Sequence, residues 1–352
     1  MKLKSVLTLA ALTFASVSFA QETAEAPLQI SGSVDTYFKY DFAKMPNVAT
    51  SFANEQNSIS LGMIDLALKK TTGKASFVGE LSFGPRGQFQ SILNSDGSYN
   101  EGTNSFHIQN LYASYAFTDK FTVTAGFMGT FIGYEVIAPT GNFNYSTSYL
   151  FSSGPFQNAG IKGSYAFTDK VSLMLGLFND WNVYQDFNGV SHIGAQLTVS
   201  PVEGWTAYLN VLSGKSVGAV GVGTILDLTT SYQVTEKVKI GLNAADYTIG
   251  NDGGGYTGGA LYLQNAFTPA VSLGLRGEYF STKDKVNGGA NLNVVPGESV
   301  AAVTLSANIK SGGLTFIPEV RYDNGTADMF AKSNLTATKN ASQFSLAVVY
   351  AF

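Results

Sequence analysis

The chain has 352 residues and no cysteine, with 21 basic and 25 acidic side chains and a formal net charge of −4. This balance argues against a nucleic-acid partner, and the lack of cysteine excludes disulfides and a lipid-anchored lipoprotein. Charged residues make up 13% of the chain, against about 25% in soluble domains, whereas tyrosine (18) and phenylalanine (25) are abundant. Few charges, many aromatic residues and no long apolar helix predict a β-barrel that faces lipid.

The first 20 residues predict a secretory signal peptide. Lys2 and Lys4 give a basic start, residues 6–14 form an apolar run, and residues 18–20 match a small-x-small cleavage site. The apolar run is too short for a transmembrane helix. We therefore expect residues 21–352 to be exported with a formal net charge of −6, and to form a single domain because no linker or change of composition divides them.

After a short lead-in, apolar and polar residues alternate in segments long enough to cross a bilayer as tilted strands. In residues 28–40, for example, Val34 and Phe38 point to one side, and Asp35 and Lys39 to the other. Sixteen such strands are predicted, at residues 28–40, 59–70, 74–83, 106–117, 121–132, 156–167, 171–181, 191–199, 205–212, 224–234, 238–249, 256–267, 271–280, 301–310, 314–323 and 342–352.

The connections between these segments alternate between short turns and longer loops rich in Gly, Asn and Ser. Three short turns repeat one motif, an aromatic or apolar residue followed by Thr-Asp/Glu-Lys, at residues 117–120, 167–170 and 234–237. Short periplasmic turns opposite long external loops, with an even strand number, are typical of outer-membrane barrels. The fold class predicted is all-β, a transmembrane antiparallel up-and-down β-barrel of about 16 strands.

A closed sheet is also what the bilayer requires, because every backbone N–H and C=O group in hydrocarbon needs a partner. With about sixteen strands the barrel is too wide for side chains to fill, so the lumen should hold water. Both signs of charge occur on the inward faces, so the sequence predicts no strong ion selectivity. The candidate pore-lining residues are Asp35, Lys39, Asp65, Lys69, Glu80, Lys162, Asp180, Asp227, Lys239, Arg276, Glu278, Lys310, Glu319, Arg321 and Asp323.

The longest predicted external connection, Gly133–Gly154, is too apolar for a loop surrounded by water. Its aromatic residues include Phe143, Tyr145 and Tyr149, and Glu135 is its one charged residue. These four residues are the candidates for a loop that folds into the lumen and sets the width of the pore. Packing of the rings against the barrel rim or a neighbouring protomer is the alternative.

The last ten residues end the chain on an unusually apolar strand. Phe344, Leu346, Val348, Tyr350 and Phe352 share one face, whereas chain ends are normally frayed and polar. The ending resembles the C-terminal signal by which outer-membrane barrels are recognised for insertion. We expect Tyr350 and Phe352 to act as an assembly signal for the barrel-assembly machinery. The alternative is an edge strand of a soluble β-sandwich.

One block of sequence carries a family resemblance. Residues 126–135 (GFMGTFIGYE), 142–146 (NFNYS), 148–151 (SYLF) and 154–156 (GPF) together resemble the OmpL-like β-barrel porin family of Gram-negative bacteria. The resemblance covers nearly the whole mature chain. It implies a water-filled channel in the lipid of the outer membrane for passive diffusion of small hydrophilic solutes, and it transfers no catalytic or solute-binding residue. Homo-oligomerisation is left open.

Two other functions are alternatives to a channel. A barrel hydrolase needs a nucleophile, a base and an orienting group, but the only histidines, His107 and His192, lie in no recognisable catalytic or zinc-binding motif. The glycine runs at 221–223 and 253–255 lack the Lys-Ser/Thr of a phosphate-binding loop. We therefore predict no enzyme, no metal and no cofactor. A structural or adhesive barrel with a plugged lumen remains the alternative.

Overall fold

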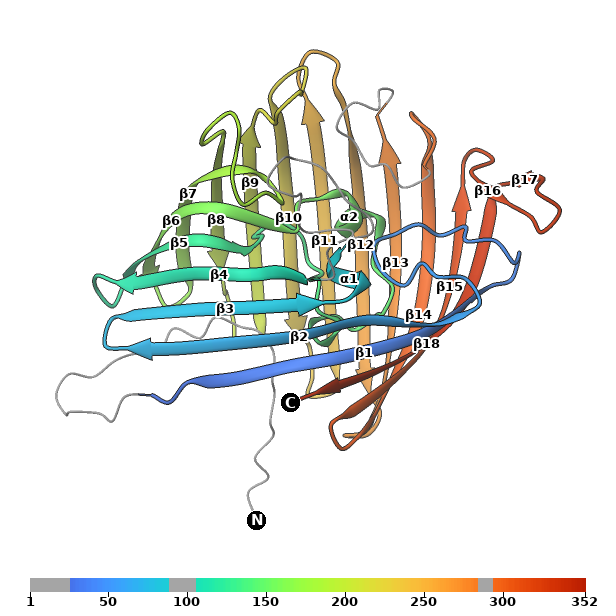
Figure 1. The fold of residues 1–352 in the computed structure, drawn as a ribbon, viewed down its shortest axis with the longest axis horizontal. Helices are drawn as coiled ribbons and strands as arrows, with labels where there is room; N and C mark the ends of the chain where they lie inside the picture. Colours follow the sequence, from blue (N-terminus) through green and yellow to red (C-terminus); the bar gives the residue numbers. More distant parts are fainter. Residues whose placement is uncertain (1–25, 89–105, 284–293) are drawn as a thin grey trace.

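The computed structural model describes residues 26–88, 106–283 and 294–352. Sixteen of its strands join edge to edge into one closed antiparallel barrel (Figure 1). Sequential strands pair with one another, and the first strand, β1, pairs with the last, β18, so that the sheet has no free edge. This confirms the predicted up-and-down barrel. No helix in the described part of the chain is long and apolar enough to cross a membrane.

Most element boundaries lie within a few residues of the predicted ones. The main exception is β5, which ends at Gly129 and not at residue 132, because the chain leaves the barrel wall there. The elements β16 and β17 form a separate two-stranded sheet. In chain order the elements are β1 (Gln29–Asp41), β2 (Ser58–Thr72), β3 (Ala75–Phe83), α1 (Pro85–Gln88), β4 (Phe106–Ala116), β5 (Phe121–Gly129), the 3-10 turn η1 (Pro139–Gly141), α2 (Tyr149–Ser153), β6 (Gln157–Thr168), β7 (Val171–Trp181), β8 (His192–Val199), β9 (Trp205–Gly214), β10 (Gly223–Gln233), β11 (Val238–Ile249), β12 (Gly254–Ala266), β13 (Val271–Thr282), β14 (Ser299–Ser311), β15 (Leu314–Gly325), β16 (Phe330–Ala331), β17 (Ala337–Thr338) and β18 (Asn340–Ala351).

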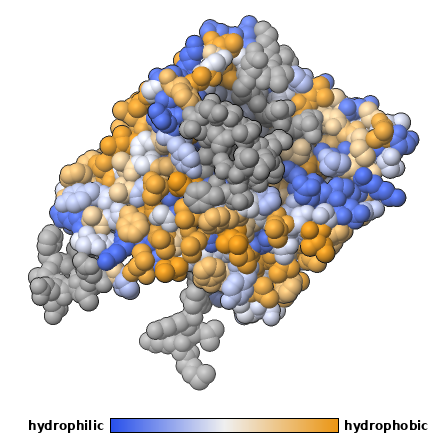
Figure 2. All heavy atoms as spheres, in the orientation of Figure 1, coloured by the Kyte–Doolittle hydropathy of each residue, from blue (hydrophilic) through white to orange (hydrophobic). Residues whose placement is uncertain are grey.

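Side chains alternate between the outer wall and the lumen, as the strand period requires. On β1, Val34 is exposed on the outside, whereas Asp35 and Lys39 are buried inside the barrel. On β2, Ile59 and Leu61 are 85% and 71% exposed. Figure 2 shows apolar residues spread over the strand wall. Exposed apolar surface of this extent suits a wall in contact with hydrocarbon and not with water.

The repeated turn motif forms the same hydrogen bonds each time. The hydroxyl oxygen of Thr118 accepts from the backbone N–H groups of Lys120 (3.2 Å) and Phe121 (3.0 Å). A threonine side chain thus satisfies backbone donors at a turn that no further strand covers. Equivalent pairs of bonds, to the N–H groups two and three residues further on, are made by Thr168, Thr235 and Thr268.

The last residue takes part in closing the barrel. The N–H of Gly32 donates to the carbonyl oxygen of Phe352, and the N–H of Phe352 donates to the carbonyl oxygen of Gly32, both at 3.0 Å. A Cβ atom at position 32 would lie 2.7 Å from the phenylalanine ring, so a glycine makes room for it. The side chains of Tyr350 and Phe352 are 44% and 57% exposed on the outer wall.

Candidate pore constriction

The connection between β5 and β6, residues 130–156, lies inside the barrel and is called the inner loop below (Figure 1). Its backbone bonds to inward side chains of strands on the far wall. The N–H of Gly133 donates to Asp227 of β10 at 2.9 Å, and the N–H of Tyr149 donates to Glu278 of β13 at 2.8 Å. These bonds place the loop against the inner wall of the barrel, and its role in setting the pore width stays a prediction.

The aromatic residues of the inner loop explain why it is so apolar. The ring of Tyr134 stacks on Tyr262 of β12 with centroids 4.4 Å apart. The ring of Phe143 lies over Gly274 of β13, where a Cβ atom would come within 2.2 Å of it. The rings of the inner loop therefore pack against Tyr262 and Gly274 of the barrel wall. This packing buries apolar surface that water would otherwise cover.

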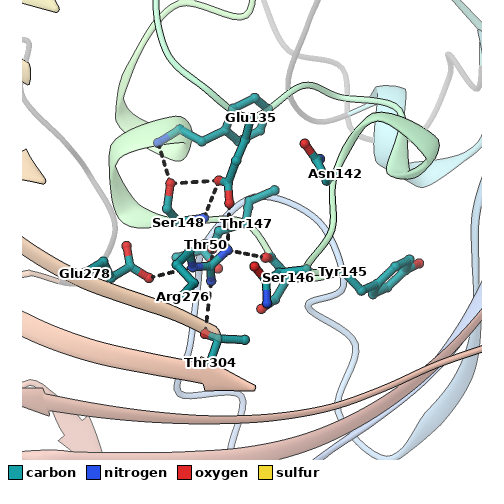
Figure 3. Close-up of polar contacts among 12 residues, drawn as sticks. Thr50, Glu135, Asn142, Tyr145, Ser146, Thr147, Ser148, Arg276, Glu278 and Thr304 are labelled. Atoms are coloured by element: carbon teal, nitrogen blue, oxygen red, sulfur yellow. Dashed lines mark hydrogen bonds and ion pairs between the residues drawn. The ribbon is translucent and has the colours of Figure 1, made fainter. Parts of the chain in front are cut away.

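Glu135, the one charged residue of the inner loop, connects two parts of the loop to the wall (Figure 3). One of its carboxylate oxygens accepts from the N–H and the hydroxyl of Ser148, both at 2.7 Å. The other accepts from Arg276 of β13 at 2.7 Å, and this arginine also donates to the carbonyl oxygen of Ser146 at 2.6 Å. Arg276 is completely buried, so these partners replace the water that its charge has lost.

A second buried arginine, Arg321 of β15, holds the same segment. It donates to the carbonyl oxygen of Thr147 at 2.8 Å, and Arg276 donates to that oxygen at 3.3 Å. The guanidinium group of Arg321 also pairs with Asp323 at 2.8 Å and lies 5.1 Å from the ring centroid of Tyr149. Two fixed cations thus converge on one stretch of loop backbone, which limits its freedom to leave the lumen.

The middle of the inner loop is fixed by β14 and β15. Glu319 accepts from the N–H groups of Tyr145 (2.8 Å) and Ser146 (3.1 Å), and from the hydroxyl of Ser306 (2.7 Å). The side-chain amide of Asn144 donates to the same serine at 2.7 Å. A buried carboxylate that accepts several hydrogen bonds is well accommodated, so Glu319 organises the loop without a cation beside it.

Other external connections enter the lumen and contact the inner loop. Arg86 of α1 lies between the rings of Phe52 and Tyr145, 4.6 and 4.7 Å from their centroids. It also donates to the carbonyl oxygen of Ile137 (3.3 Å) and pairs with Asp35 of β1 (3.6 Å). The β1–β2 connection, Arg86 of α1 and the inner loop therefore pack together inside the barrel.

The candidate pore-lining residues divide into two groups. Most are buried inside the barrel: Asp35, Lys39, Asp65, Asp227, Arg276, Glu278, Glu319, Arg321 and Asp323. These buried residues point inward, but their surroundings are protein groups and not open water. The others are half-buried or exposed: Lys69, Glu80, Lys162, Asp180, Lys239 and Lys310. Arg86 was missed because it lies in a connection, where strand alternation gives no signal.

The described neighbours of the two histidines do not have the arrangement of a Ser-His-Asp triad. His107 of β4 and His192 of β8 are buried, at 2% and 4% exposure. The Nδ1 atom of His192 is 2.7 Å from the hydroxyl of Ser191, which donates to Asp186 at 2.9 Å. In a Ser-His-Asp triad the imidazole stands between the hydroxyl and the carboxylate, whereas here the hydroxyl stands between the other two. The described residues hold no cluster of three His, Asp or Glu that could bind a metal.

The family comparison and the comparisons with solved structures each cover nearly the whole barrel. Residues 27–352 match the family model described as "Putative beta-barrel porin-2, OmpL-like". No curated protein matches the sequence. Among solved structures, OprB of Pseudomonas putida at high pH is 12% identical with a TM-score of 0.64, over 92% of this chain and 94% of that one. In-vitro folded OmpT of Vibrio cholerae is 12% identical with a TM-score of 0.57, over 94% and 100%. A mutant of the Rh. blastica porin is 13% identical with a TM-score of 0.55, over 93% and 100%. At these identities the solved structures share the fold.

Proposed function

The chain belongs to the OmpL-like β-barrel porin-2 family and is an outer-membrane porin, and we propose that small hydrophilic solutes diffuse through a lumen that the inner loop narrows. The observation that carries the proposal is a set of hydrogen bonds to the backbone of residues 145–149. Glu278 and Glu319 accept from backbone N–H groups, and Arg276 and Arg321 donate to backbone carbonyl oxygens. A loop bonded across the lumen reduces the cross-section that solutes can use, because a barrel of sixteen strands is otherwise wide.

The narrowing element would consist of Glu135, Phe143, Tyr145 and Tyr149 together with the wall residues that bind them. The inward charges that stay accessible, such as Lys162 and Glu80, would line the passage beside it. Because the loop is anchored at both ends and in its middle, the pore should have a fixed size limit and not fluctuate widely.

We also propose how the chain reaches the outer membrane of a Gram-negative bacterium. A leader of 20 residues would be removed on export, and residues 21–352 would form the barrel as one domain. Tyr350 and Phe352 would be read by the barrel-assembly machinery before the barrel enters outer-membrane lipid. No catalytic role is proposed, because among the described residues the Ser191 hydroxyl, and not the His192 imidazole, stands between the other two groups.

The test is electrical. Purified protein in a planar bilayer should give discrete conductance steps and should exclude solutes above a fixed size. A variant lacking residues 142–148 should conduct more and admit larger sugars, while it still migrates as a folded barrel on unheated gels. As a control, deletion of residues 332–335 at the β16–β17 tip should leave conductance and size limit unchanged.

The buried charge cluster makes a plugged barrel the second candidate. In that case the intact protein would be silent in the bilayer, and only the variant lacking residues 142–148 would conduct. If the intact protein conducts and the deletion changes neither conductance nor size limit, the inner loop does not set the width.

A further inference from the structure

The charged side chains inside this barrel differ in how accessible they are to a permeating ion. The buried arginines have acidic partners: Arg276 pairs with Glu135 at 2.7 Å and with Glu278 at 3.5 Å, and Arg321 pairs with Asp323 at 2.8 Å. These side chains are almost fully enclosed by protein. Two arginines face three carboxylates here, so the ion pairs leave one net negative charge, which is enclosed by protein.

Buried carboxylates outnumber buried cations, but two of those with no described cation within ion-pair distance, Asp227 and Glu319, are surrounded by donors. Asp227 accepts from the N–H of Gly133 (2.9 Å) and from the side-chain amides of Asn210 (2.7 Å) and Asn243 (2.5 Å). Glu319 accepts from two backbone N–H groups and a hydroxyl. The positive ends of these donors point at the carboxylates and reduce the negative field that reaches the open part of the lumen.

The inward charges that remain accessible toward the short-turn side are mostly lysines. Lys162 of β6 and Lys239 of β11 are half-buried, and Lys69 of β2 and Lys310 of β14 are exposed. Each lies on the lumen face of its strand, in phase with a buried inward residue, as Lys310 is with Ser306. Among the described residues, no carboxylate lies within ion-pair distance of any of the four lysines.

The carboxyls on this half of the lumen face are fewer. Asp65 of β2 is buried, and Glu80 of β3 accepts a hydrogen bond from the side chain of Asn110 at 2.5 Å. The register places uncharged residues beside the lysines: Lys239 pairs with Gln233 and Gln264. Four lysines therefore face two carboxyls in this half of the described lumen wall.

The repeated turns at the same end add no net charge. Residues 118–120, 168–170 and 235–237 each carry one acidic residue and one lysine. Opposite charges this close together cancel beyond a Debye length, which is about 8 Å at physiological salt. The lysines of the lumen face are thus the main unbalanced charge that solutes meet on this side of the inner loop.

We infer that the channel favours small anionic solutes over cations, with Lys69, Lys162, Lys239 and Lys310 as the residues that set this preference. The inference rests on the proposed channel function. Lysines on a low-dielectric wall raise the local concentration of anions and lower that of cations, which is how charged rings select ions in wide pores. The sequence predicts no strong ion selectivity because it does not distinguish buried charges from accessible ones. The inferred anion preference replaces that expectation.

The test measures the zero-current potential of the channel in a planar bilayer with a potassium chloride gradient. For the wild type, chloride should permeate about twofold or more faster than potassium at low salt, and this ratio should fall as salt rises. The double variant Lys162→Glu, Lys239→Glu should shift the ratio toward potassium.

The control variant carries the same charge change outside the lumen. Lys332→Glu lies in the β16–β17 connection, where the side chain is exposed, and should leave the ratio unchanged. All variants should first show heat-modifiable migration, and a charge-neutral pair, Lys162→Gln with Lys239→Gln, serves if the glutamate pair does not fold. A cation-selective wild type, or a ratio that the lumen variants leave unchanged, would overturn the inference. A channel that never conducts would overturn the proposed function itself.

Discussion

The hydroxyl of Tyr145 donates a hydrogen bond to Asp35 at 2.5 Å and so joins the middle of the inner loop to the first strand. The same carboxylate accepts from the N–H of Met63 at 2.8 Å and pairs with Arg86. One inward side chain of β1 thus receives groups from β2, from α1 and from the inner loop. The position of the loop depends on residues that lie far from it in the sequence.

Removal of that hydroxyl should loosen the loop without unfolding the barrel. Tyr145→Phe keeps the ring between its neighbours but leaves Asp35 with one donor fewer, at a cost of about 1–3 kcal/mol. We expect more current noise in single-channel recordings and a slightly lower unfolding temperature. Tyr279→Phe, on the exposed outer face of β13, is the matched control. Recordings of Tyr145→Phe as quiet as those of the control would contradict this role.

Breaking the arginine cluster should have a larger effect. Arg276→Met leaves Glu135 and Glu278 buried without that cation, which costs about 3–5 kcal/mol in comparable buried pairs. The free energy of unfolding in denaturant should fall by about that amount, and conductance should rise as residues 146–148 are released.

The double variant Arg276→Met, Glu135→Gln isolates this interaction. Because Glu135 accepts directly from Arg276, the two substitutions should not be additive, and the double variant should be more stable than their sum predicts by about 0.5–3 kcal/mol. Additive losses would mean that the two side chains act independently.

The C-terminal ring should matter for assembly more than for conduction. Phe352→Ser removes an exposed ring of the outer wall but leaves the backbone bonds to Gly32 possible. We expect less folded protein in the outer membrane and an unchanged conductance for the molecules that do insert. Phe117→Ser, at another exposed phenylalanine near a short turn, is the control. Equal surface abundance of both variants would remove Phe352 from the recognition signal.

The buried Tyr134 of the inner loop should make the barrel less stable at high pH. Burial, with a smaller contribution from the charge of Glu135, raises the pKa of Tyr134 from 10.0 to about 12. The folded state therefore holds this proton more tightly than the unfolded state does. The stabilisation is complete below pH 10 and is lost as the pH rises toward 12.

Spectrophotometric titration of tyrosinate can check this. The component that titrates near pH 12, to which Tyr184 also contributes, should decrease in Tyr134→Phe, and the variant should lose less stability between pH 10 and 12 than the wild type does. Burial raises the pKa of Tyr145 and Tyr149 further still, so these two residues should ionise only when the loop itself is released. A decrease near pH 10 in place of pH 12 would mean that Tyr134 is accessible to water.

The barrel could be predicted from sequence because lipid on one side and a polar interior on the other impose a period of two on every strand. Local chemistry also sufficed for the turns, since Thr118 and Thr168 bond to N–H groups only two and three residues away. The predicted end of β5 was wrong. The chain leaves the barrel wall after Gly129, but the residues that follow continue the alternating pattern of a strand.

The charge pattern inside the lumen could not be predicted to the same depth. Alternation shows that Lys162 and Arg276 both point inward, but only the path of the inner loop decides that one stays accessible and the other is enclosed. That path depends on contacts between residues more than a hundred positions apart, such as Tyr145 with Asp35. Arg86 lies outside the strands, so no periodicity pointed to it.

The seam between Gly32 and Phe352 imposes an order on biogenesis. The ring of strands cannot close until β18 has been made, because the closing ladder pairs β1 with β18 from Ser33–Ala351 to Asp41–Gln343. The inner loop is made much earlier, yet its partners Asp227, Glu278 and Glu319 lie on strands that follow it. We expect the loop to bind each of these strands as it is added to the sheet. The loop would then already lie in the lumen when β1 pairs with β18, and it would not have to enter a closed barrel afterwards.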